Sequence, residues 1–177
     1  MRKLIYLYSI SLVMLIGFQA AAQQQTNEKP GDETYTGILH QEDFKNHYYS
    51  WFSPAYTAFK PSKATINKIA EHINKYNIKV FMGTWCSDSQ REIPHLYKIL
   101  ELANYDLENL EVYTMDEYKT TAANYEKGLN IQFVPSILFF DKNGKEVNRI
   151  VEFPQETLET DILKIITGQD YKNVYAE

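Results

Sequence analysis

The stretch Val80-Phe81-Met82-Gly83-Thr84-Trp85-Cys86-Ser87-Asp88-Ser89 joins an apolar run to a helical pattern and holds the single cysteine of this 177-residue chain. Residues 78–82 are mostly apolar and predict a short strand that ends at Gly83. A thiol at the start of a helix lies at the positive end of the helix dipole, which favours thiolate over thiol. Cys86 is therefore the first candidate for chemistry. The helix is predicted from Cys86 to about Ala103 because one face carries Ile93, Leu96, Tyr97 and Leu100, and Pro94 should kink it.

The pattern on either side of this stretch alternates strands and helices. Ser62 is a candidate N-cap for a helix whose apolar positions continue to Ile73. Strands are predicted at 110–115, 137–140 and 147–151, and the last two flank a hairpin turn at 141–145 that contains Asn-Gly. Helices are predicted over 120–129 and from Pro154 to Gly168. Strands separated by helices pair in parallel, whereas the hairpin adds an antiparallel edge. The sequence therefore predicts an α/β domain of three layers with a mixed central sheet.

The two ends of the chain differ in composition from its middle. We expect a signal peptide at 1–22, because two basic residues precede an apolar run and Ala20-Ala21-Ala22 offers a cleavage site. The alternative is an uncleaved membrane anchor, but the apolar run is short and contains Tyr6, Ser9 and Ser11. No later stretch is long enough to span a bilayer. Residues 23–34 read as a disordered leader, 35–60 as an aromatic-rich N-terminal extension, 61–168 as the domain, and 169–177 as a loose tail. The extension either packs against the domain or forms a binding lid. We expect an exported protein, located in the periplasm of a Gram-negative bacterium.

Composition excludes several function classes. The chain has 23 acidic and 18 basic residues and a net charge of −5, which argues against a nucleic-acid partner. One cysteine forms no internal disulfide and no cysteine-based zinc or iron–sulfur site, and the seven glycines build no phosphate loop. We therefore expect neither a metal nor a cofactor.

Several of these features occur together in one known family. Trp85-Cys86 follows a strand, Pro94 lies eight residues beyond the cysteine, and Val134-Pro135 precedes the next strand. With the Asn-Gly hairpin and the last helix, the chain resembles the thioredoxin superfamily from residue 62 to residue 168. The resemblance implies a thioredoxin-like fold, an active-site helix that begins at Cys86, and a cis peptide bond between Val134 and Pro135.

Two positions depart from the pattern of the dithiol members. Ser89 stands where those members have a second cysteine, and Val80 stands where many have a buried acid. The first change removes an intramolecular disulfide. The second removes a group resembling a proton acceptor for the resolving thiol. The two losses are consistent with each other.

The first functional hypothesis is a monothiol thiol–disulfide oxidoreductase. Cys86 would attack a disulfide, and an external small-molecule or protein thiol would resolve the mixed disulfide. Ser89 would donate a hydrogen bond to the thiolate. Trp85 would flank the thiol, and Val134 and Pro135 would present backbone groups to an extended substrate. The partners are protein or small-molecule thiols and disulfides.

Asp88 and Arg91 should modulate this thiol. The Asp88 carboxylate suits the first turn of the helix but opposes a nearby thiolate, and Arg91, three residues on, should partly neutralise it. The alternative function is a catalytically degenerate binding module for a protein or peptide, with the aromatic segment as its contact surface. A third possibility is an inert, buried Cys86.

Overall fold

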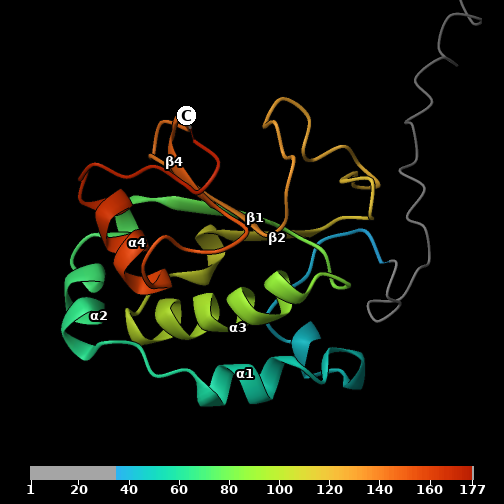
Figure 1. Cartoon of the computed structure of the whole chain (residues 1–177), viewed down its shortest axis with the longest axis horizontal. Helices are drawn as coiled ribbons and strands as arrows, with labels where there is room; N and C mark the ends of the chain where they lie inside the picture. Colours follow the sequence, from blue (N-terminus) through green and yellow to red (C-terminus); the bar gives the residue numbers. More distant parts are fainter. Residues whose placement is uncertain (1–34, 177) are drawn as a thin grey trace, which may run out of the picture.

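The structure is a computed structural model that describes residues 35–176, so the expected signal peptide and the whole expected leader lie outside the described residues (Figure 1). The helices are α1 (Phe52–Ala58), α2 (Lys63–Ala70), α3 (Ser87–Leu102) and α4 (Leu158–Ile166), and the strands are β1 (Asn77–Met82), β2 (Leu110–Thr114), β3 (Ser136–Phe140) and β4 (Glu146–Val151). Short 3-10 turns lie at Asp43–Lys45, His47–Tyr49, Ile73–Lys75 and Leu107–Asn109. Within residues 35–176, no helix is long and apolar enough to cross a membrane.

The sheet has the order β2-β1-β3-β4. β1 pairs with β2 in parallel, and β3 pairs antiparallel with both β1 and β4. The turn between β3 and β4 is held by Asp141, whose carboxylate accepts hydrogen bonds from the amides of Asn143 and Lys145. Gly144 takes the left-handed conformation there, with φ of 80°. The expected mixed sheet and the hairpin are both confirmed.

The helices cover one face of this sheet, on the lower side of Figure 1. Alternate residues of the strands point to this face, and Ile78, Val80 and Ile137 pack there against α3 and α4. The opposite face carries Phe81 and Leu138 and is covered by the irregular segment 116–135. The three layers are therefore helices, sheet and an irregular segment.

The helix predicted at 120–129 is wrong, because this stretch forms successive turns. The Thr121 hydroxyl accepts from the amide of Tyr125, and the Glu126 carboxylate accepts from the amide of Thr121. Lys119 and Asn124 have positive φ, which ends a right-handed helix. Side chains that bond nearby backbone groups compete with helix formation, and here they prevail over a weak periodicity.

Two predicted helix boundaries also move. Ser62 caps α2 as expected, but α2 ends at Ala70, and Ile73 begins a 3-10 turn. α4 begins at Leu158, four residues after Pro154, because the Thr157 side chain accepts from the amide of Thr160. The buried Asp161 carboxylate accepts from the amides at 155 and 156 and holds that segment in a turn.

The aromatic extension packs against the domain. Phe44 and Tyr49 are buried, and the Phe44 ring contacts Tyr97 of α3 edge-on at 5.5 Å between centroids. α1 lies along α3 in Figure 1. Ile38 forms an isolated antiparallel bridge with Tyr113 of β2. Of the two roles expected for this segment, the structure shows packing.

We expected a loose C-terminal tail, but the structure shows that the tail packs against the domain. Tyr171 is buried, and its carbonyl accepts from the Asn148 side chain at 3.0 Å. The Lys172 carbonyl accepts from Gln155 at 3.3 Å, and the Tyr175 ring stacks on Phe133 with centroids 4.2 Å apart. The tail therefore reaches back to the segment that precedes β3.

Candidate thiol site

Cys86 is the N-cap residue of α3, and its side chain is partly exposed. Its backbone is extended, as is usual for an N-cap residue, whereas the next residue is already helical. The thiol donates a hydrogen bond to the carbonyl oxygen of Val134, with sulfur and oxygen 3.2 Å apart. The peptide bond between Val134 and Pro135 is cis, as the resemblance implied. The structure thus brings together the cysteine and the proline loop, 48 positions apart in the sequence.

Ser89 does not take the role that we expected. It is completely buried, and its hydroxyl oxygen accepts from the amide of Gly83 at 3.2 Å. Within the described part of the chain, it donates no hydrogen bond to Cys86. Ser89 therefore ties the end of β1 to the first turn of α3. Val80, at the position of the missing acid, is buried between Val112 and Ile137.

Trp85 precedes the cysteine, and both residues pack, partly buried, against the cluster around Phe81 on the outer face of the sheet. Its indole N–H donates to the carbonyl of Met115 at 3.0 Å, and the ammonium of Lys119 lies 5.0 Å from the ring centroid. The ring lies directly against Gly83, where an added Cβ would meet the ring atom Cε2 at 2.6 Å. Gly83 is therefore needed for the close approach of the indole.

Replacing Gly83 by alanine should displace Trp85 and lower the free energy of unfolding by about 1–3 kcal/mol, the usual cost of overpacking. Urea denaturation measures the loss, and Trp85 fluorescence in a Trp51→Phe background reports the displacement. The same substitution in a Trp85→Ala background should cost much less, because the clash is gone. Equal costs in both backgrounds would show that the close approach is not the reason.

Asp88 and Arg91 form the expected ion pair, with 2.7 Å between Oδ1 and Nη2. Arg91 also donates from Nε to Glu92 at 2.6 Å. Burial opposes the charge of Arg91, but the bonds to Glu92 and Asp88 prevail and raise its pKa. Arg91 thus partly compensates the charge of Asp88.

Glu92 is a site neighbour that sequence reasoning missed. Its side chain is buried, and its second oxygen, Oε2, has no hydrogen-bond partner within residues 35–176. His95 lies 3.8 Å from that oxygen and stacks on Phe59. The position of Glu92, four residues before the buried Leu96, was the available signal, since residues four apart share a helix face.

The proline loop is held from its other side by β4 and the tail. Val134 and Pro135 are both buried, and the Pro135 carbonyl accepts from the amide of Glu152 at 2.7 Å. Glu152 has a φ of 58°, and its carboxylate accepts from the Tyr175 hydroxyl. Of the backbone groups of Val134 and Pro135 expected to face a substrate, the two carbonyls are thus bonded within the protein. No sequence signal pointed to Glu152 or Tyr175, because a non-local contact brings them here.

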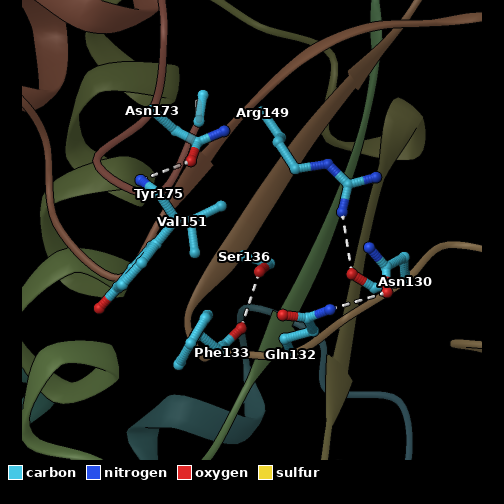
Figure 2. A pocket seen from close by; sticks show the side chains of 9 residues that line it. Asn130, Gln132, Phe133, Ser136, Arg149, Val151, Asn173 and Tyr175 are labelled. Atoms are coloured by element: carbon cyan, nitrogen blue, oxygen red, sulfur yellow. Dashed lines mark hydrogen bonds between the residues drawn. The ribbon is translucent and has the colours of Figure 1, made fainter.

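Two cavities open on the described part of the chain, and Cys86 lines neither of them. A pocket of about 210 Å³ lies between the tail and the segment before β3, with Phe133 and Ser136 in its wall (Figure 2). A larger groove of about 650 Å³ runs along the aromatic extension, where Phe44, Tyr49 and Tyr56 line it. Among the residues that the structure describes, no cluster of three histidine, cysteine or acidic side chains is placed to hold a metal ion.

The chain is similar in fold and in sequence pattern to known proteins. A solved structure of a protein of unknown function from Pseudomonas aeruginosa matches with a TM-score of 0.50 and 19% identity, over 68% of this chain and 81% of that one. An HIV epitope-scaffold matches with a TM-score of 0.50 and 20% identity, over 69% and 83%. These similarities show the fold alone. No curated relative matches the chain. The family model described as thioredoxin matches residues 39–165, which include the cysteine, the cis-proline loop and most of the aromatic extension. This chain therefore belongs to the thioredoxin family.

Proposed function

We propose that the protein is a thiol–disulfide oxidoreductase that works with one thiol, Cys86. The observation that carries the proposal is the placement of a partly exposed cysteine at the start of a 16-residue helix, with its sulfur 3.2 Å from the carbonyl oxygen of Val134 in the loop that contains the cis-proline. The first amides of an α-helix have no acceptor within the helix, and the helix dipole is positive there. A group that carries negative charge during the reaction is therefore well placed at this position.

The reaction has two exchange steps. The Cys86 thiolate attacks one sulfur of a substrate disulfide, a new sulfur–sulfur bond forms, and the other substrate sulfur leaves with the electron pair. Since the chain has no second cysteine, an external thiolate then attacks the mixed disulfide and releases Cys86. The resolving thiol is a small molecule or a partner protein. Trp85 would flank the reacting sulfur, and Arg91 pairs with the Asp88 carboxylate.

The compartment is part of the proposal. Residues 1–22 have the composition of a signal peptide, and we propose that the mature protein is exported to the periplasm. Disulfides form and persist in such compartments, so substrates are available there. Cys86 is then either held in a mixed disulfide with a partner or kept reduced by an external thiol.

The proposal predicts a reversible adduct. Reduced protein incubated with oxidised glutathione should gain the mass of one glutathione on Cys86, and excess reduced thiol should remove it. Mass spectrometry of the intact protein and its peptides measures both steps. A Ser87→Ala variant is the matched control, since Ser87 is exposed and adjacent, and it should form the same adduct. A protein that gains no adduct under native conditions, but does so when unfolded, would contradict the proposal.

A binding module is the second candidate function, and one observation favours it. The groove of about 650 Å³ beside the extension is lined by aromatic side chains, and Tyr56 and Phe52 in it are only partly buried. Such a groove suits a peptide ligand with apolar side chains. Partner capture that survives the Cys86→Ala substitution unchanged, without any exchange activity, would favour this function.

A further inference from the structure

The pocket between the tail and the segment before β3 has uncommitted hydrogen-bond donors (Figure 2). The backbone amide of Tyr175 donates to Oδ1 of Asn173, and the Gln132 side chain donates to Oδ1 of Asn130. Each asparagine side-chain oxygen therefore already accepts a hydrogen bond, and the NH₂ group of the same side chain is the one that a ligand could engage. Within residues 35–176, neither NH₂ group donates to the protein. Two amide donors in one pocket suit carbonyl oxygens, which the backbone of a peptide supplies.

The charged group in the wall is already neutralised. Arg149 donates from Nε and Nη2 to the Glu146 carboxylate, each at 2.6 Å, and from Nη1 to the Leu129 carbonyl at 2.9 Å. Its guanidinium therefore anchors the irregular segment to β4. An anionic ligand would have to displace Glu146. The pocket suits a neutral polar ligand better.

Tyr175 connects this pocket to the thiol. Its ring stacks on Phe133 within the pocket wall, and its hydroxyl binds Glu152, whose amide binds the Pro135 carbonyl. The hydrogen bond to Glu152, with burial and the negative charges of Glu152 and Asp88, raises the pKa of Tyr175. Phe133 is the neighbour of Val134, whose carbonyl accepts from Cys86.

We propose that this pocket is a subsite for the peptide chain that flanks the reacting disulfide, and that Tyr175 determines its specificity. This rests on the function proposed for Cys86. An extended chain advances about 3.3 Å per residue, so a substrate cysteine at Cys86 places residues a few positions away along the proline loop and beside Tyr175. The substrate class is then a protein or peptide disulfide rather than a small-molecule disulfide.

Two reagents with the same leaving group test the subsite. The first is acetyl-Ala-Gln-Cys-Ala-Gln-amide with a thiopyridyl group on its cysteine, and the second is dithiodipyridine, which has no peptide. In both reactions Cys86 forms a disulfide and thiopyridone leaves, so its absorbance gives the rate. Tyr175→Ala should slow the peptide reaction about tenfold and leave the dithiodipyridine reaction within about twofold of wild type. Tyr125→Ala is the matched control, since Tyr125 is also an exposed, stacked tyrosine but lies on Tyr113, and it should change neither rate.

The possible results distinguish a failure of the subsite from a failure of the function proposed for Cys86. Equal slowing of both reagents, or no slowing of the peptide, would overturn the subsite. If wild-type protein reacts with neither reagent, the proposed function of Cys86 fails, and binding alone then judges the pocket. In that case the same peptide with an S-methylated cysteine is titrated into ¹⁵N-labelled protein. Shifts of the Asn130 and Asn173 side-chain amide signals that disappear in Tyr175→Ala would support a peptide site, and their absence in wild type would overturn it.

Discussion

Replacing Cys86 by serine should reduce disulfide exchange to the rate of the external thiol alone. A serine hydroxyl is not ionised at neutral pH and does not form a mixed disulfide, so the catalysed rate should fall at least about a hundredfold. The assay is reduction of insulin with glutathione as the resolving thiol. The volume change is small and Cys86 is partly exposed, so the fold should persist with its stability nearly unchanged.

The control for this result is Ser87→Ala, which changes the adjacent exposed residue and should retain the wild-type rate. The Cys86→Ala variant should behave like Cys86→Ser. If wild type and both Cys86 variants give the same rate, the protein does not catalyse disulfide exchange, and its similarity to the family is limited to the fold.

Truncating Phe44 to alanine should lower the free energy of unfolding by about 3–5 kcal/mol, the range for buried aromatic side chains. Phe44 is 3% exposed and stacks on Phe52 with ring centroids 4.6 Å apart. It also contacts Tyr49 and Tyr97, so its loss opens a cavity between the extension and α3. Urea denaturation of the wild type and the variant measures the difference.

Tyr48 provides the matched control from the same segment. Its side chain is 55% exposed, so Tyr48→Ala should change stability by no more than about 0.5 kcal/mol. A loss below about 1 kcal/mol for Phe44→Ala would mean that the aromatic extension is an appendage and not part of the core.

The predictions that succeeded rest on local patterns. Strand β1, helix α3 and the hairpin at 141–145 each follow from periodicity or turn chemistry within a few residues. The prediction for 120–129 failed because Thr121 and Glu126 bond nearby backbone groups, a competition that apolar spacing does not reveal.

The candidate site was only partly predictable for a similar reason. Cys86, Trp85 and the proline loop were found because they occur in a known order along the chain. We predicted that Ser89 donates a hydrogen bond to the sulfur. Its hydroxyl instead accepts from the Gly83 amide, because the turn between β1 and α3 brings that amide close. Glu152 and Tyr175 reach the loop through tertiary contacts, and their distance from Cys86 along the sequence does not predict those contacts.

The bridge between Ile38 and Tyr113 has a consequence for self-association. The amide of Leu39 donates to Val112 at 2.9 Å, and the amide of Thr114 donates to Gly37 at 2.8 Å. These bonds occupy the outer side of β2, which would otherwise offer a row of unpaired donors and acceptors to a second molecule. A proteolytic cut near residue 40 would uncover that row, so an intact N-terminal segment should protect the protein from forming edge-to-edge aggregates.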